Sequence, residues 1–593
     1  MKMKKTNLYK KVAFPLMSLF LALGTVSCDD FFEPETDDVL SGDDYMAEQT
    51  EMYTGFLGIM SRMQAVGDKA IYLTETRGEL LEPTTYSTSD LIALYNYDED
   101  LTGNPYADPA GYYDVVIACN DYLVNIEEFG EQYPELWDQK VSDGLISSTI
   151  RLKVWAYMML AEIYGEALWF DDPITEIQDL TKFELLNTES IVDKCLNLLE
   201  NGYNGVASNI VFSWYQWLDP DTPLGESVYR YWDYMIPTYE GLYAKTALWK
   251  GAFLQKNGRN DEANVYYENI VDMLAETINQ HMLNVSNQEW NRSQLSAPRS
   301  KYWKSEEPSK FQAVSVLKYD YTDNQTNSLM KHFNTEYPNK YWLCPSDSGL
   351  ARWSDPVFNP GASTGDSRFE ANFTETVAGS NEYYVSTYVR DTQLPYQDDT
   401  YIYLFRADEY HFFMIEALNN LGRYTEADVL MNMGISRYAT SVGVKSVEAW
   451  EEHQATARIF TEFSSLWVGA LDGSHKYSND GIRNVLGLKD RTFITDEEVE
   501  SNVAKKANDC AIADEYMLEF AVEGKTYPAL IRIATRWNDY SIIADRIAPK
   551  YGARSAEIHS KIMAGGYWVP WDLQVGSADD SNVESGESSG ETE

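Results

Sequence analysis

The sequence contains few cysteines and histidines, and none of them stands in a metal-binding or redox pattern. Its five cysteines are widely scattered, with no C-x-x-C pair and no zinc-type spacing. The six histidines form neither an H-E-x-x-H motif nor a pair four residues apart. We therefore assign no metal and no cofactor from these residues.

Nucleotide-binding and nucleophile motifs are also missing. The chain has no Walker loop and no dinucleotide-binding G-x-G-x-x-G. One literal G-x-S-x-G occurs at Gly586–Gly590, but it lies in an acidic, serine-rich tail without the strand and helix that a nucleophile elbow needs. Carboxylates are too numerous for an acid–base pair to be chosen by inspection. A surface glycoside hydrolase therefore stays open as an alternative.

A partial calcium motif occurs at Asp98–Gly103, which resembles the first half of a calcium-binding loop. The twelfth position of this loop is Pro109, where calcium loops carry a bidentate Glu. No metal site is assigned there, and calcium binding is left open.

Positive charge is scarce. The chain has 47 Lys and Arg against 93 Asp and Glu, a formal net charge of −46. Such a protein is repelled by phosphate backbones, so nucleic acid is a poor candidate partner. The acidity is otherwise typical of a protein that must stay soluble outside the cell.

The N-terminus reads as an export signal. Several lysines are followed by an apolar run from Val12 to about Val26, and Ser27 then stands directly before Cys28. Residues 1–27 are the predicted signal peptide, and the apolar run is short for a membrane span. The residues before Cys28 resemble a bacterial lipobox, so we expect acylation of Cys28 and a lipidated acidic tether over residues 28–40. The alternative is an ordinary secreted protein with a free Cys28.

Two segments that lie far apart in the chain, 239–278 and 402–440, follow the same pattern. Each has apolar residues at the spacing of one helix face, then a glycine, then a second amphipathic helix. In 402–440 the first helix is expected to include Leu404, and Thr425 is expected to cap the second helix. The two turns align as Gly258-Arg259-Asn260-Asp261-Glu262-Ala263 and Gly422-Arg423-Tyr424-Thr425-Glu426-Ala427. This turn is typical of tetratricopeptide-type hairpins.

The predicted fold class is mainly α, with tetratricopeptide-like hairpins as a scaffold that carries long, irregular, aromatic-rich loops. Residues 41–576 are predicted to form a single binding domain, and residues 577–593 a disordered acidic tail. The remaining helical patterns are at 41–63, 112–128, 150–173 and 190–202, and 79–111 is predicted to be a loop. Within 150–173 the helix is expected to stop near Gly165.

Five short segments stand in a particular order along the chain: S-C-D-D-F-F-E-P at 27–34, R-x-x-x-W-A-Y at 151–157, F-R-A-D-E-Y at 405–410, E-x-x-x-E-G at 519–524 and G-Y-W-V-P at 566–570. These segments and their order resemble the SusD/RagB family. The resemblance implies a non-enzymatic lipoprotein, anchored to the outer membrane and facing outward. It also implies capture of an oligosaccharide or other nutrient oligomer for a TonB-dependent, SusC-like transporter. A tetratricopeptide scaffold that binds only proteins is a third possibility.

Aromatic residues are abundant, with 43 Tyr and 16 Trp. The resemblance implies that the ligand rings come from an early loop and a mid-chain loop that converge on one face. Sugars offer apolar C–H faces and hydroxyl groups, which suit aromatic rings beside polar side chains. The alternative is that these rings only pack the loops onto the helices. The rings expected to bind ligand are Tyr86, Tyr95, Tyr302, Trp303, Trp342 and Trp353.

Acylation of Cys28 is directly testable. In a bacterial host that processes lipoproteins, labelled palmitate is expected to enter the wild-type protein and not Cys28→Ala, because the thioether needs the cysteine sulfur. Equal label in both proteins, or none in the wild type, would show that Cys28 is not the anchor.

Overall fold

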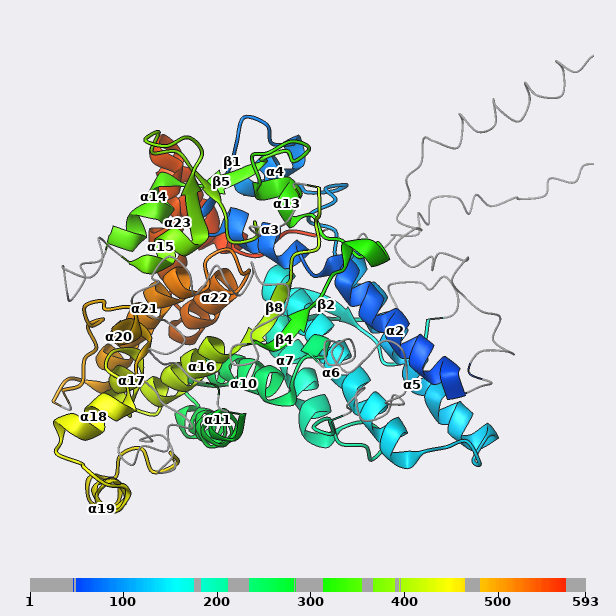
Figure 1. Ribbon diagram of the computed structural model, residues 1–593, viewed down its shortest axis with the longest axis horizontal. Coiled ribbons are helices and arrows are strands. Elements are labelled where there is room, and N and C mark those ends of the chain that lie inside the picture. Colours follow the sequence, from blue (N-terminus) through cyan, green and yellow to red (C-terminus); the bar gives the residue numbers. More distant parts are fainter. Residues whose placement is uncertain are drawn as a thin grey trace, which may run out of the picture.

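The computed structural model describes residues 46, 49–174, 183–211, 234–281, 283, 313–354, 366–389, 394, 396–463, 480–496 and 498–571. The architecture is mainly helical, with long N-terminal helices on one side and the later hairpins on the other (Figure 1). The predicted signal peptide, the tether with Cys28 and the acidic tail lie outside the described residues. None of the helices in these ranges is long and apolar enough to cross a membrane.

The N-terminal third of the chain contains a layer of long helices. Within it α5 (Ala110–Gln132) packs against α2 (Gln49–Val66) and α6 (Gln139–Tyr164), and α6 in turn packs against α7 (Thr188–Asn201). The carboxylate of Asp138 caps α6 by accepting from the backbone N–H groups of Lys140 and Val141. Gly165, at φ 80°, ends the helix. The predicted stop at Gly165 is confirmed, whereas α6 begins earlier than the predicted residue 150.

The two predicted hairpins are present, as α10 (Tyr239–Lys256) with α11 (Asn260–His281) and α16 (Ala407–Asn420) with α17 (Tyr424–Met431). Their turns share one hydrogen-bond pattern. The N–H of Arg259 donates to the carbonyl of Leu254 at 2.8 Å, and that of Arg423 to Leu418 at 2.9 Å. The glycine before each arginine has a positive φ, which completes a Schellman motif.

Each of these arginines also pairs with the glutamate three residues later. The Arg259–Glu262 pair is 2.6 Å long and exposed, and the Arg423–Glu426 pair is 2.5 Å long and more buried. The two copies of the G-R-x-x-E-A sequence therefore adopt the same turn, and contacts within the turn determine its conformation.

Three details of the 402–440 prediction are wrong. Residues Ile402–Arg406 form strand β8 instead of the first helical turn, because they pair with strand β4 (Ala313–Leu317). No side-chain cap precedes α17, which starts at Tyr424, so Thr425 is not its cap. Gly434, at φ 79°, divides the expected second helix into α17 and α18 (Ile435–Ser441).

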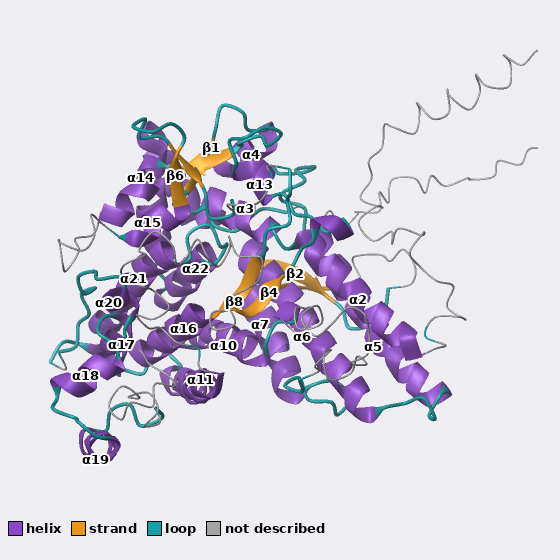
Figure 2. Cartoon of the chain, in the orientation of Figure 1, coloured by secondary structure: helices purple, strands orange, loops and turns teal. Residues whose placement is uncertain are grey.

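The strands described are short and form antiparallel pairs (Figure 2). The predicted loop at 79–111 contains one of them, β1, and helix α4 (Ser89–Tyr95), which Thr88 caps through its side chain. Besides β4 with β8, the pairs are β1 (Leu81–Pro83) with β5 (Leu343–Pro345), β2 (Glu166–Trp169) with β3 (Glu184–Asn187), and β6 (Phe373–Glu375) with β7 (Tyr383–Val385).

The remaining helices complete the scaffold around these pairs. The four described cysteines, Cys119, Cys195, Cys344 and Cys510, are free thiols. The helices not yet given are α3 (Lys69–Arg77), α13 (Leu329–Phe333), α14 (Asp347–Leu350), α15 (Ser367–Asn372), α19 (Val447–Ala457), α20 (Ile482–Val485), α21 (Ser501–Glu519), α22 (Thr526–Trp537), α23 (Ser541–Ile547) and α24 (Ser555–Lys561).

Buried ion pairs link these helices. Glu416 on α16 accepts from Arg532 at 2.7 Å and from Arg536 at 2.6 Å, both on α22, and all three side chains are almost fully buried. Burial alone would raise the pKa of Glu416, but the charges and hydrogen bonds of the two arginines lower it to about 2. Glu416 is therefore ionised inside the protein and holds α22 against the hairpin.

Replacing this carboxylate should destabilise the protein strongly. Glu416→Gln keeps the shape of the side chain but leaves buried arginine charge uncompensated, which should lower the free energy of unfolding by about 3–5 kcal/mol at pH 7. The pKa of Glu416 in the folded protein lies below the ordinary glutamate value of 4.5, so its stabilising effect is complete above that pH and is lost on acidification toward about 2. The difference in free energy of unfolding between wild type and Glu416→Gln should therefore become smaller as the pH falls from 4.5 toward about 2. Denaturant titrations at several pH values measure it.

The exposed Glu276 on α11 is the matched control, because Glu276→Gln should change stability by no more than about 0.5 kcal/mol. A Glu416→Gln variant as stable as this control would contradict the proposed role of the buried pair.

Candidate functional site

The pairing of β1 with β5 brings the early loop and the mid-chain segment together near the top of the molecule in Figure 1. The N–H of Thr84 donates to the carbonyl of Trp342 at 3.0 Å, and its hydroxyl donates to the carbonyl of Tyr341 at 2.5 Å. The hydroxyl of Ser87 also donates to the Trp342 carbonyl. Tyr86 and Trp342, two of the six predicted ligand rings, therefore belong to one locally ordered unit.

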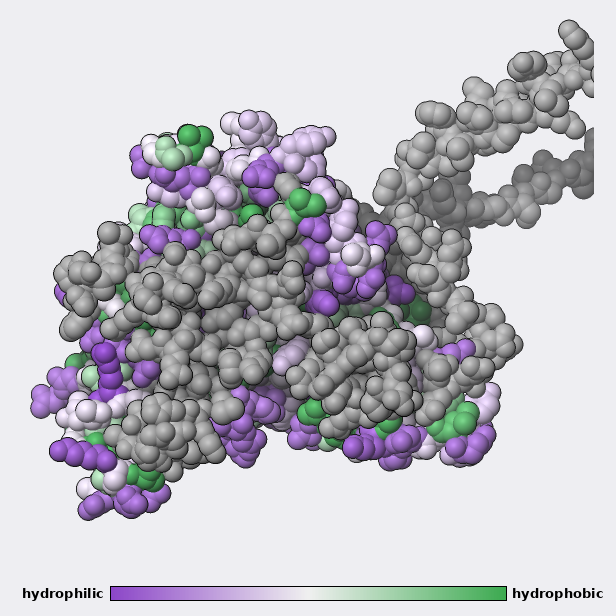
Figure 3. Space-filling model, viewed as in Figure 1, coloured by the Kyte–Doolittle hydropathy of each residue, from purple (hydrophilic) through white to green (hydrophobic). Residues whose placement is uncertain are grey.

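Exposed aromatic rings are found on this unit. Tyr86 is 69% exposed, and Tyr337, in the turn between α13 and β5, is 91% exposed. We call Tyr86, Tyr337 and Trp342 the aromatic face. Exposed rings of this size offer flat apolar faces on which a ligand can stack. In Figure 3 the surface at the upper end of the molecule is coloured mostly as polar or weakly polar, with a few hydrophobic residues between.

The half-buried Trp342 rests on a fixed support. Its ring meets His332 edge-on at 5.0 Å, and His332 stacks on Tyr72 at 4.0 Å. Burial lowers the pKa of His332 to about 4. The imidazole is therefore neutral at physiological pH, and it lies 2.8 Å from both the Tyr106 hydroxyl and the Ser328 carbonyl. This support limits the motion of Trp342 before any ligand arrives.

The backbone beside Trp342 is held in an unusual conformation. Tyr341 has φ 50°, which is rare for an aromatic residue and costs about 1–3 kcal/mol. The contacts to Thr84 and a hydrogen bond from the Tyr341 hydroxyl to the Tyr383 carbonyl at 3.2 Å maintain it. Strain of this kind is concentrated at functional sites.

The remaining predicted rings have different outcomes. Trp353 is only 4% exposed and meets Phe373 edge-on at 5.1 Å, so its assignment as a ligand ring is wrong and it is a core residue. Tyr95 is half-buried and packs on Tyr551 at 4.5 Å, which makes it a support for the early loop. Tyr302 and Trp303 lie outside the described residues. Tyr337 was missed, because no sequence feature separates an exposed tyrosine from a buried one.

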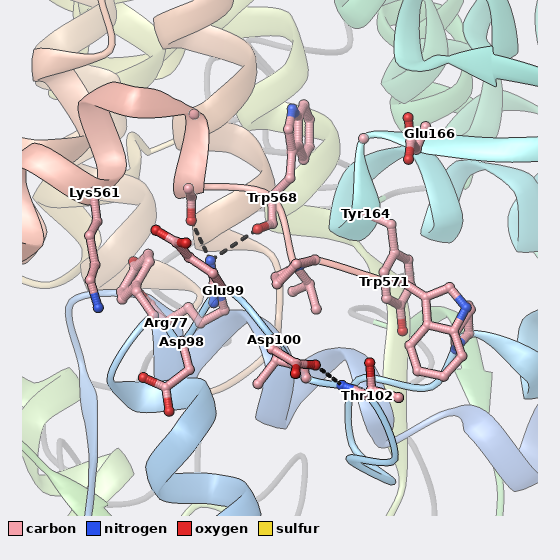
Figure 4. Close-up of a pocket in the computed structure, with 18 of the residues that line it drawn as sticks. Arg77, Asp98, Glu99, Asp100, Thr102, Tyr164, Glu166, Lys561, Trp568 and Trp571 are labelled. Atoms are coloured by element: carbon pink, nitrogen blue, oxygen red, sulfur yellow. Dashed lines mark hydrogen bonds between the residues drawn. The ribbon is translucent and has the colours of Figure 1, made fainter. Parts of the chain in front are cut away.

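A second feature is a cavity of about 770 Å³ at the end of α6 (Figure 4). Its walls come from residues 97–102, from the end of α6 with the start of β2, and from residues 561–571. Trp568 and Trp571 line it together with the carboxylates of Asp98, Glu99, Asp100 and Glu166. None of the three residues of the aromatic face lines this cavity.

The partial calcium motif forms one edge of this cavity. Asp100 accepts from the N–H of Thr102 at 2.9 Å, and this hydrogen bond lowers the pKa of the Asp100 carboxyl. Within the described ranges, no group of three or more His, Cys, Asp or Glu side chains is arranged to hold a metal ion.

Comparison with solved structures defines the class of fold. A SusD superfamily protein from Bacteroides vulgatus is 12% identical, with 90% of this chain and 97% of that chain covered, at a TM-score of 0.58. NanU from B. fragilis is 13% identical, with 86% and 94% covered, at 0.52. A laminarin-binding SusD-like protein is 13% identical, with 84% and 94% covered, at 0.51. The chain therefore has the SusD-like fold, which confirms the fold that the sequence motifs predicted.

No family model and no curated protein matches the chain. The similarity to the solved structures is one of fold. At 12–13% sequence identity, most side chains differ between the proteins.

Trp353 is buried and Tyr86 is exposed, and the effect of each ring on the free energy of unfolding can test this difference. Trp353→Ala should lower the free energy of unfolding by about 3–5 kcal/mol, because it empties a packed aromatic site. Tyr86→Ala removes a ring that is mostly in solvent and should cost no more than about 0.5 kcal/mol. Denaturant titration of both variants measures the two values. Similar losses in both would mean that Tyr86 is also a packing residue.

Proposed function

We propose that this protein is a surface lipoprotein of the SusD type that binds glycan through its aromatic face. The observation that carries the proposal is the set of Tyr86 and Tyr337, which are both largely exposed, and Trp342, whose ring rests on His332. Rings fixed at the surface can stack on the apolar faces of sugars without a large entropic cost. The SusD-like fold supports the same function, since one structural neighbour is named as laminarin-binding and another, at a TM-score of 0.50, as a surface glycan-binding protein.

In this proposal Cys28 anchors the protein to the outer membrane, facing outward. The bound oligosaccharide, or another nutrient oligomer, then passes to a TonB-dependent, SusC-like transporter. The motif resemblance and the predicted signal peptide support this part. A pull-down of the tagged lipoprotein from outer-membrane extracts of its native host tests it, with a TonB-dependent transporter as the expected partner.

The proposed protein performs no chemistry on the glycan. A glycosidase needs a general acid whose pKa is raised by burial in an apolar pocket. In the cavity of Figure 4, Glu99, Asp100 and Glu166 are exposed, and the pKa of Asp100 is lowered. Release of reducing ends from a polysaccharide panel by the purified protein, abolished by substitution of these carboxylates, would favour the hydrolase instead.

Glycan binding should depend on the aromatic face. Each stacked ring contributes on the order of 1 kcal/mol, so the double variant Tyr86→Ala with Trp342→Ala should bind about 10–100-fold more weakly. The measurement is calorimetric titration of the mature chain with a glycan that binds the wild type, chosen from a polysaccharide panel.

The matched control for this titration is Tyr266→Ala, a half-buried tyrosine on α11, which lies at the opposite end of the molecule in Figure 1. It should leave the affinity unchanged. Unchanged affinity in the double variant, with a lowered melting temperature, would mean that the aromatic face only packs the loops.

A further inference from the structure

The walls of the cavity at the end of α6 are fixed before a ligand arrives. Trp568 lies against Gly165, where a β-carbon would come within 2.6 Å of the indole ring. The N–H of Val569 donates to the carbonyl of Ile163 at 2.9 Å. Arg77 donates to the carbonyl of Trp568 at 3.0 Å. The volume of about 770 Å³ is within the range of small-molecule sites.

Two side chains on the wall carry polar atoms that lack a partner among the described residues, Tyr164 through its hydroxyl and Arg77 through Nε and Nη1. Tyr164, the last residue of α6, lines the cavity, and its buried hydroxyl has no hydrogen-bond partner among the described residues. Figure 4 shows its side chain extending into the cavity region on the side of Trp571. A buried hydroxyl left unpaired costs about 1–3 kcal/mol, and such groups are rare in folded proteins. A ligand that carries hydroxyl groups would satisfy it.

The charges around the cavity narrow the class of ligand. Four carboxylates line it against two cations, Arg77 and Lys561. Arg77 is only 1% exposed, and its Nη2 donates to backbone carbonyls, whereas its Nε and Nη1 have no hydrogen-bond partner among the described residues. Lys561 donates to the carbonyl of Asn96 at 3.1 Å and pairs with Glu557 at 3.4 Å. The accessible charge is therefore negative, which repels anions and leaves acceptors for hydroxyl donors.

We propose that this cavity is a second glycan site that takes an uncharged sugar and excludes acidic ones. Its parts match such a ligand: the half-buried rings of Trp568 and Trp571 offer apolar surfaces, and Tyr164 and the carboxylates offer hydrogen-bond partners. The choice of a sugar rests on the proposed function. The site itself shares no lining residue with the aromatic face.

The experiment is calorimetric titration of the mature chain with the neutral trisaccharides cellotriose, maltotriose, mannotriose and xylotriose, and with trigalacturonic acid as the acidic probe. The wild type should bind at least one neutral probe at two sites. Trp571→Ala should remove one of these sites or weaken it at least about tenfold, while the Tyr86→Ala with Trp342→Ala variant should remove the other.

A surface charge change tests the exclusion of acids without disturbing the interior. Glu166→Lys should lower the preference for neutral over acidic trisaccharide at the cavity at least about threefold, because it reverses one charge at the rim. Glu184→Lys is the matched control: Glu184 is also exposed, lies on the paired strand β3, and does not line the cavity.

The outcomes separate the two proposals. Binding lost in the aromatic-face variant alone, with Trp571→Ala and Glu166→Lys behaving as wild type, overturns the cavity site and leaves the proposed function intact. Binding lost in Trp571→Ala alone supports the cavity site and overturns the role of the aromatic face. No binding of any neutral probe, or equal binding of the acidic one at the cavity, overturns the proposal made here.

Discussion

A network of buried arginines and carboxylates holds the middle of the chain against its C-terminal helices. Arg368 pairs with Asp366 at 2.6 Å, with Glu515 at 2.8 Å and with Glu519 at 2.9 Å, and Arg406 also pairs with Glu519, at 2.9 Å. Each buried ion costs several kcal/mol unless its partners are complete. Segments more than a hundred residues apart must therefore meet in one arrangement, and α15, β8 and α21 are fixed relative to one another.

Features with a local cause were predictable from the sequence. The two hairpin turns form hydrogen bonds within six residues, so Gly258 and Gly422 mark them in the sequence as well as in the structure. Strand β8 was not predictable, because Leu404 fits the helical spacing of the residues that follow, and only pairing with β4, about ninety residues earlier, makes it a strand. Long-range pairing overrode local periodicity there.

The candidate site was only partly predictable for the same reason. The expectation that an early and a mid-chain loop meet came from family resemblance, and the β1–β5 pairing is the physical means by which these loops meet. The sequence does not indicate which individual rings are buried. Trp353 and Trp342 have similar polar neighbours in the sequence, yet Trp353 packs against Phe373 and Trp342 rests on His332. The cavity draws on residues from both ends of the chain, which no local pattern reveals.

The contact between Arg77 and Trp568 joins positions 491 residues apart and closes one wall of the cavity. A ribosome makes the chain from its N-terminus, so the loop at 97–102 and the end of α6 exist long before residues 566–571 do. The cavity can therefore form only once nearly the whole protein has been synthesised. A product that ends before Trp568 would contain the sequences of both hairpins and of the early loop but would lack this wall. An intact cavity therefore requires that translation has passed Trp571.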